Sequence, residues 1–501
     1  MNEADAPDTV RTTLVRNTFW YGLVTVFGLA AGLLMSIVLA RGLGPAAMGD
    51  YSYLLWALRV LTAVAALGWT LATVRYTADA YGRGARAEAR GFVAFFLRRQ
   101  LATTGVVAAA VVVLALTVVD AGLRWPFVVL AVMLIPVTVE GIYTHAVYGA
   151  QRYDLTTQTS TVKMALHLTA SVVAVAAGLD ILGLVIGLTL GSSISCLIQR
   201  ARAGALLGDV AVPPPRTMHA DIRSYVASLS VVAVLDALVR DRSELFFLGL
   251  WASSEEIAFY SLAFGLATRV MVVPEIAVGA LLPAFSALHG RGDGEQLRRV
   301  YATAMRYVAL AGVPIAALTA ALAPGLVHWL YGAAYLPTAP LLSVLVLVAV
   351  VGALRKVAFA ALQAVGDRRC ALTATGAAVA LNVILAGALI PGHATTGAVA
   401  ANSAAQLLAA LWAFRGMARA HGARVPVGEI AKITVGSVPV FLVTRAVAGE
   451  SHDLLRLGLA ALAGVAVFLP VLVGGRLIGR REWTMLITST RRLLAPPASG
   501  A

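Results

Sequence analysis

Five charged side chains lie close together in an otherwise apolar stretch that reads DALVRDRSELFFLGLW. Asp236, Arg240 and Glu244 recur every four residues, so on a helix they form one stripe of alternating charge. Asp241 and Arg242 lie about 100° and 200° around such a helix from Arg240. Five isolated charges at the centre of a membrane helix would cost roughly 12–17 kcal/mol. We therefore expect this helix to line a water-filled cavity or to pair its charges with neighbouring helices.

Two further arginines lie deep inside apolar stretches. Arg59 lies about 12 Å and Arg269 about 15 Å along its helix from the end that we place outside, at about 1.5 Å per residue. Neither has an acidic residue one turn away in the sequence. A guanidinium group offers a fork of donors that fits two phosphate oxygens, and an ionisable residue inside a membrane is a candidate functional group. The alternative is that these arginines pair with acids such as Glu140, Glu275 or Asp236.

Other intramembrane charges lie in the fourth, fifth, eighth and tenth apolar stretches. Arg355 and Lys356 point about 100° apart on one helix, so we expect at most one of them to face a central cavity. Glu140 and Glu275 each lie shortly after a proline, and they could carry a coupling proton or serve as counter-ions of arginine. Lys163 lies near the cytoplasmic end of its stretch, so we expect its ammonium group to extend to that surface.

Membrane helices must position these residues. Of the 501 residues, 59% are hydrophobic and only 13% are charged, against about 25% charged in soluble chains. Apolar runs near the ~20 residues that cross a bilayer predict an all-α multi-pass membrane protein. The two cysteines, Cys196 and Cys370, fit neither a disulfide framework nor a metal site, and we expect no cofactor. The fourteen predicted helices are 17–40, 51–74, 100–119, 126–146, 156–178, 181–199, 224–251, 259–284, 303–323, 338–365, 371–391, 395–414, 432–448 and 456–475.

The basic residues predict an orientation in the membrane. They give a net charge of +14, but they punctuate the apolar runs and form no single patch, which argues against a nucleic-acid partner. Cytoplasmic loops of membrane proteins are rich in Lys and Arg. With the N-terminus inside, 28 of the 39 Lys and Arg residues belong to cytoplasmic segments, and four flank outer turns: Arg41, Arg124, Arg445 and Arg456. This asymmetry predicts an inner or plasma membrane protein with both termini in the cytoplasm.

A Pro-rich stretch and a weak internal repeat predict two lobes. The stretch VPPPR follows the sixth helix and is typical of a stiff linker. The second and eighth helices share a Tyr-Ser pair and a later arginine, which indicates two lobes of six helices in the same orientation. The matching residues are Tyr51, Ser52 and Arg59 in one helix and Tyr260, Ser261 and Arg269 in the other. The predicted divisions are a cytoplasmic tail at 1–16, a first lobe at 17–199 (helices 1–6), a cytoplasmic linker at 200–223, a second lobe at 224–414 (helices 7–12), helices 13–14 at 432–475 and a basic cytoplasmic tail at 476–501.

Several segments together resemble the polysaccharide flippases, which form the polysaccharide-transporter branch of the MOP exporter superfamily. The similar segments, in chain order, are LARGLGPAAMGDYSY, YGAQRYD, RDRSELFFLGLWASSEEIAFYSLA, PEIAVGALLPAFSAL, WLYGAAYLPTAPLL and TTGAVAANSAAQ. The resemblance implies two six-helix lobes around a central cavity, with two further C-terminal helices. It also implies one task, which is to move a lipid-linked oligosaccharide on a polyprenyl diphosphate from the inner to the outer leaflet by alternating access.

The resemblance gives roles to the intramembrane charges. It implies that the substrate diphosphate meets a cationic cavity, for which the candidate residues are Arg59, Arg240, Arg242, Arg269 and Arg355. Candidates for ion coupling or for structural ion pairs are Glu140, Asp236, Asp241 and Glu275. The implied partners are the lipid-linked oligosaccharide and membrane lipids, and they extend to a polysaccharide polymerase and glycosyltransferases of the same pathway.

Three alternatives remain open at this point. A lipid II flippase of peptidoglycan synthesis belongs to the same superfamily. A MATE-like cation-coupled multidrug exporter would want an acidic residue in the cavity of its first lobe, and the first helix carries none. A membrane glycosyltransferase or polymerase would need a large extramembrane loop, whereas the longest outer turn, about 324–337, cannot hold a catalytic domain. We therefore expect a transporter and not an enzyme.

Overall fold

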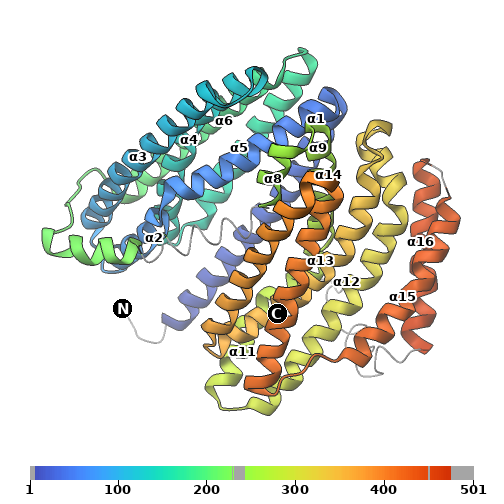
Figure 1. Ribbon diagram of the computed structural model, residues 1–501. Helices are drawn as coiled ribbons and strands as arrows, with labels where there is room; N and C mark the ends of the chain where they lie inside the picture. Colours follow the sequence, from blue (N-terminus) through green and yellow to red (C-terminus); the bar gives the residue numbers. More distant parts are fainter. Residues whose placement is uncertain (1–5, 228–229, 231–242, 450–451, 475–501) are drawn as a thin grey trace, which may run out of the picture. The chain divides into compact units, whose positions relative to one another are not determined.

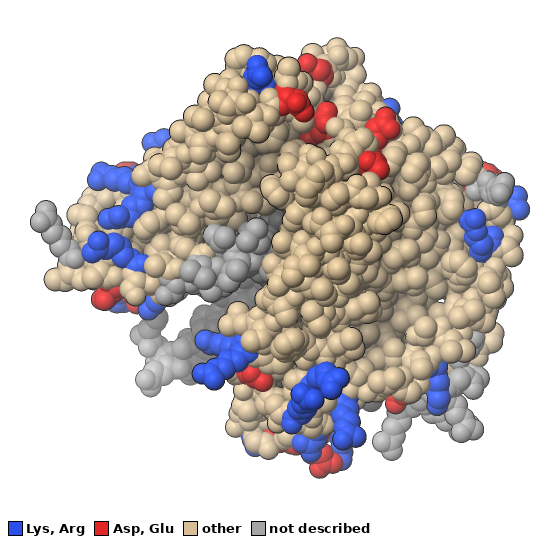
Figure 2. Space-filling view, viewed as in Figure 1, with Lys and Arg blue, Asp and Glu red and all other residues tan. Residues whose placement is uncertain are grey.

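The computed structural model describes residues 6–227, 230, 243–449 and 452–474, and every regular element in this part of the chain is helical (Figure 1). The chain divides into two compact units, Met1–Ala258 (unit 1) and Phe259–Ala501 (unit 2). Unit 1 therefore extends beyond the predicted linker, and the division into functional lobes at 200–223 stays a prediction. On the face of each unit shown in Figure 2, the sides of the helices are mostly tan, and the blue Lys and Arg side chains gather toward helix ends.

Unit 1 is a bundle in which α4 lies between α3 and α6, and α5 packs against α1 and α6 (Figure 1). Ten described helices of the whole chain are long and apolar enough to cross a membrane. The elements that begin in unit 1 are α1 (Ala6–Ala66), α2 (Trp69–Gly82), α3 (Arg86–Thr117), α4 (Ala121–Gly149), α5 (Tyr153–Ala176), α6 (Ile181–Leu207), η1 (Arg216–Met218), α8 (Glu244–Trp251) and α9 (Ser254–Val270).

In unit 2, α12 packs against both α13 and α15, while α14 covers α13 and α16 covers α15 (Figure 1). Buried aromatic rings, among them Phe285, Tyr301 and Tyr335, fill the interior of this unit. Its elements after α9 are α10 (Val272–Ile276), η2 (Ala277–Ala280), α11 (Leu281–Gly290), α12 (Gly294–Tyr331), η3 (Ala333–Tyr335), α13 (Thr338–Ala364), α14 (Arg368–His421), α15 (Val427–Ala448) and α16 (Leu454–Gly474).

Two helices are long enough to cross a bilayer twice, and each has one non-helical residue at an interior position. The apolar part of α1 has 45 residues and α14 has 54, or about 68 and 81 Å at 1.5 Å per residue. A bilayer core is only about 30 Å thick. Gly44 interrupts α1 with φ 79°, a conformation that glycine adopts without steric cost, and Pro45 restarts the helix. Ala394 interrupts α14 with φ 44°. The predicted pair 371–391 and 395–414 thus corresponds to the two segments of α14. The predicted helix 51–74 is wrong as a single element, because α1 ends at Ala66 and α2 begins at Trp69, with Leu67 and Gly68 at positive φ between them.

The predicted helix 259–284 is wrong as a single element. The structure instead ends α9 at Val270 and continues through the short α10 and η2 before α11 begins at Leu281. Pro274 lies in this interval and has no backbone N–H to donate to the preceding turn, which favours a break there. Of the predicted helix 224–251, the centre lies outside the described residues, and α8 forms its C-terminal end.

The predicted linker is packed against unit 1. The Val212 N–H donates to the Ala87 carbonyl at the start of α3, 2.9 Å away. One turn further, Gly91 lets the linker approach so closely that a Cβ atom there would lie 1.7 Å from the Val212 carbonyl oxygen. Ile222 is fully buried, and Arg75 lies over the Tyr225 ring at 4.2 Å. The segment after α6 is therefore part of the bundle's end.

The close approach at Gly91 gives a stability prediction. Gly91→Ala is expected to destabilise the protein by about 1–3 kcal/mol, since the linker must move off α3 to admit the methyl group. Gly105→Ala is a matched control on the same helix, because a Cβ there meets nothing within 4 Å and alanine favours helix by about 0.5–1 kcal/mol. Thermal unfolding of both purified variants in detergent would measure the difference. Equal unfolding temperatures would show that the linker is not tightly packed.

Candidate functional site

A buried ion pair joins α4 to α5 in unit 1. The Glu140 side chain lies on α4, and the residue is only 7% exposed. Its Oε2 lies 2.8 Å from Nζ of Lys163 on α5. Its Oε1 accepts a hydrogen bond of 2.8 Å from the Ser195 hydroxyl on α6. Three helices thus satisfy both oxygens of one carboxylate, which is the arrangement that an ionised group needs away from water.

This pair borders a pocket of about 400 Å³ in the same unit. His167 also lines the pocket, and its Nε2 lies 3.1 Å from the Ser192 hydroxyl on α6. The pocket brings a carboxylate, an ammonium group, an imidazole and two hydroxyls together inside the helix bundle. Its lining residues are Val137, Glu140, Gly141, Thr144, Ser160, Lys163, Met164 and His167. The arrangement can bind a polar or ionic group, and Lys163 could exchange Glu140 for another anion.

The structure gives Lys163 a partner that the sequence did not predict. Its ammonium group pairs with Glu140, and its extension to the cytoplasmic surface stays a prediction. The reason for the pairing is the packing of α4 against α5. A nearby carboxylate inside the bundle stabilises the ammonium group of Lys163 more than contact with distant water would. For Glu140, the structure shows an ion pair with a lysine, and not with an arginine as the sequence suggested. Whether Glu140 also carries a coupling proton stays a prediction.

Unit 2 contains a second carboxylate–lysine pair. Glu275 on α10 lies 2.5 Å from Nζ of Lys356 on α13. Its neighbour Arg355 points elsewhere, with its guanidinium 5.0 Å from the centre of the Phe359 ring. Adjacent residues on one helix therefore face different surroundings, as their 100° separation predicts. Lys356 takes the carboxylate, and Arg355 packs on an aromatic ring.

The two arginines of the repeat lie on α1 and α9. Arg59 is exposed, and no described carboxylate lies within 4 Å of its guanidinium. Arg269 is half-buried in the last turn of α9. The described counter-ions that the sequence offered them, Glu140 and Glu275, are both paired with lysines. Four further candidates, Asp236, Arg240, Asp241 and Arg242, lie outside the described residues.

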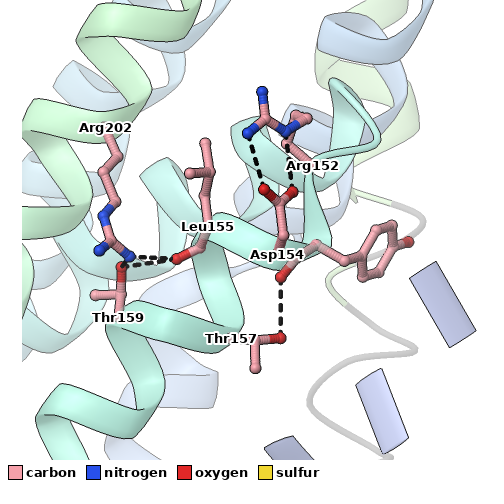
Figure 3. Close-up of polar contacts among 7 residues, drawn as sticks. Arg152, Asp154, Leu155, Thr157, Thr159 and Arg202 are labelled. Atoms are coloured by element: carbon pink, nitrogen blue, oxygen red, sulfur yellow. Dashed lines mark hydrogen bonds and ion pairs between the residues drawn. The ribbon is translucent and has the colours of Figure 1, made fainter. Parts of the chain in front are cut away.

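One polar junction was missed by the sequence reasoning (Figure 3). It lies in the YGAQRYD segment between α4 and α5, where Gln151 has φ 58°. Arg152 binds both oxygens of Asp154, at 2.9 and 2.8 Å, and these bonds raise the pKa of Arg152. Arg202 on α6 donates to the Leu155 carbonyl at 2.6 Å and to Thr159 at 2.8 Å. An arginine two residues before an aspartate at a helix start was the available signal. The junction fixes the first turn of α5, which precedes the pocket residues on the same helix.

Comparison with known families gives a direct assignment. The profile of the family described as "Polysaccharide biosynthesis protein" matches residues 38–340, which is more than half of the chain. The chain belongs to this family. A second profile, described as "Lipid II flippase MurJ", matches residues 261–463 of this polysaccharide biosynthesis protein. No curated protein sequence matches it.

Solved structures show the fold of this family member. A lipid II flippase MurJ in an inward closed conformation matches with a TM-score of 0.72 at 13% identity, over 91% of this chain and 98% of the other. An inward-facing multidrug resistance MATE family transporter of the MOP superfamily matches with a TM-score of 0.62 at 16% identity, over 79% and 95%. A MOP superfamily transporter from Pyrococcus furiosus matches at 0.54 and 17% identity, over 81% and 95%. The protein therefore has the all-α fold of these membrane transporters, as the resemblance implied, and its described residues include ten helices long and apolar enough to cross a membrane.

Proposed function

We propose that the protein is a flippase that moves a polyprenyl-diphosphate-linked oligosaccharide, a precursor of a polysaccharide such as O-antigen or capsule, from the cytoplasmic to the outer leaflet. The family match over residues 38–340 carries this proposal. The transporter fold and the basic composition, with a net charge of +14, support an anionic cargo handled by a membrane protein. The protein performs transport by alternating access and makes or breaks no covalent bond in its cargo.

Arginines of both units are proposed to hold the diphosphate. Arg59 on α1 is exposed, and Arg269 and Arg355 are half-buried on helices of unit 2. Because a guanidinium binds phosphate oxygens in a bidentate manner, these side chains suit a diphosphate better than a cation. Arg240 and Arg242 complete the proposed set from the charged stretch. Glu140 and Glu275 keep the two lysines neutralised, so that the arginines supply the net positive charge of the cavity.

The orientation and the partners also belong to this proposal. The excess of Lys and Arg in the segments assigned to the cytoplasm supports cytoplasmic termini and a cavity that loads from the inside. The prenyl chain stays in the bilayer while the head group passes between the lobes at 17–199 and 224–414. The enzymes that build and polymerise the oligosaccharide would act before and after this step.

A lipid II flippase is the second candidate. The MurJ profile match over residues 261–463 and the TM-score of 0.72 to the MurJ structure favour it. Both cargoes would present a diphosphate to the same arginines, so the two candidates differ in the sugar.

Transbilayer movement of labelled lipids in vesicles that contain the purified protein tests the proposal. We expect a polyprenyl-diphosphate oligosaccharide to reach the opposite leaflet faster than in protein-free vesicles. Parallel samples with lipid II and with a cationic dye separate the alternatives. Faster movement of lipid II would favour the second candidate, and movement of the dye with an inert lipid would show a multidrug exporter.

A further inference from the structure

A second pocket, in unit 2, is lined by none of the candidate transport residues. It has a volume of about 280 Å³ and lies where the ends of α12, α15 and α16 meet. Its floor is apolar, and its polar side chains are Arg445 from the last turn of α15 and His452 from the connection to α16. The apolar lining includes Leu322, Pro324 and Leu457.

The arginines at this pocket belong to the side of the membrane on which the chain places few Lys and Arg residues. Only four arginines flank the turns assigned to the outside, and two of them, Arg445 and Arg456, lie here. Arg456 has a structural task, because its Nε donates to the Val447 carbonyl at the end of α15, 2.8 Å away. Arg445 is exposed, and no ion pair joins it to a described carboxylate. A cation placed on the unfavoured side of the membrane, with no carboxylate partner among the described residues, is suited to an external anion.

The imidazole on the rim is held in place. His452 stacks on His328 of α12, with ring centroids 3.9 Å apart and an angle of 23° between the rings. Stacking fixes the His452 ring beside the pocket mouth, where a ring N–H can donate to an oxygen anion. One guanidinium and one imidazole lie beside an apolar floor. This arrangement suits an amphipathic ligand that has an anionic group attached to an apolar part.

The surroundings of the pocket are those of a membrane surface. The helices beside it carry large exposed apolar side chains, including Leu442, Leu455 and Leu459 at 58–77%. Exposed leucines on helices of a membrane protein face lipid chains. A phospholipid whose chains lie along this surface would bring its phosphate to the height of Arg445. A small soluble phosphate would gain nothing from the apolar floor.

We propose that this pocket binds an anionic phospholipid of the outer leaflet, with its headgroup phosphate at Arg445 and His452 and its glycerol region on the floor formed by Leu322, Pro324 and Leu457. None of the candidate transport residues lines this pocket, and only the assignment to the outer leaflet rests on the orientation in the proposed function. Charge complementarity and the apolar floor together favour a lipid over a soluble anion. The bound lipid would tie the α15–α16 pair to the membrane beside α12.

Native mass spectrometry of the full-length protein in detergent tests the site. We expect phosphatidylglycerol to be retained at least fivefold more than phosphatidylcholine, and Arg445→Gln to abolish this preference. Arg445→Lys should keep part of it, because the charge remains without the fork. Arg41→Gln is the matched control, since it removes an exposed arginine that is also assigned to the outside but lies in unit 1.

Each other outcome would overturn the proposal. Equal retention of phosphatidylglycerol by Arg445→Gln and by the unchanged protein would leave Arg445 as a helix-end cation only. Binding of inorganic phosphate as tight as that of the lipid would show a soluble-anion site. Equal retention of phosphate-free diacylglycerol would show an apolar groove without headgroup recognition. Because Arg445 is exposed, its variants should fold. The variant His452→Gln tests the same headgroup site through a second residue, and it should also weaken the preference for phosphatidylglycerol.

Discussion

Replacing Lys163 by methionine is expected to destabilise the protein by about 2–4 kcal/mol. Removal of one partner of a buried ion pair usually costs about 3–5 kcal/mol, because the other charge is left unpaired. The side chain of Glu140 is only 10% exposed, so its carboxylate would lose its main counter-ion and keep only the Ser195 hydroxyl. We place the cost toward the low end because the neighbouring pocket of about 400 Å³ lets water reach the carboxylate. Thermal unfolding in detergent would measure the change.

A double variant separates the charge from the packing. Lys163→Met with Glu140→Gln removes both charges and keeps side chains of similar size, so we expect it to regain most of the lost stability. Lys163→Arg keeps the cation and is the conservative control. If Lys163→Met unfolds at the same temperature as the unchanged protein, the pair contributes nothing to stability and Lys163 is free to serve the cargo. If the double variant is as unstable as the single one, the methylene packing of Lys163 is what matters.

Arg59→Ala is expected to slow the flipping of a polyprenyl-diphosphate oligosaccharide at least tenfold, which corresponds to about 1.4 kcal/mol. Arg59 is exposed on the apolar α1, and no described carboxylate neutralises it within 4 Å. Such a position is costly inside a membrane unless the arginine meets water or an anion. The initial rate of transbilayer movement in vesicles would measure the effect, normalised to the amount of folded protein.

The matched controls for this experiment lie on the same helix and in the other unit. Arg41→Ala removes an exposed arginine near the kink of α1 and should leave the rate unchanged. Arg59→Lys should retain part of the rate, since lysine keeps the charge but lacks the fork. Arg269→Ala on α9 should slow flipping as strongly as Arg59→Ala if one arginine of each unit holds the diphosphate. Normal rates in both alanine variants, at normal expression, would refute this shared role.

The sequence alone determined the class of protein and most of its helices. A membrane-spanning helix satisfies its own backbone within about 20 consecutive apolar residues, so its signal is local and can be read from the chain. The predicted helix 338–365 corresponds to α13 at Thr338–Ala364, and the predicted helix 456–475 lies at α16. The break in α1 could also be predicted from the sequence, because the conformational preferences of Gly44 and Pro45 favour an interruption there.

The pairing of the charged residues depends on how the helices pack. Glu140 and Lys163 are 23 positions apart and Ser195 is 55 positions from Glu140, and no local rule selects these partners among the other intramembrane charges. The packing of α4 against both α5 and α6 brings them together. Long-range contacts determine the rotation and the depth of each helix, and these determine which charged residues can pair. The charged residues can therefore be read from the sequence, but their pairing follows from the packing of the helices.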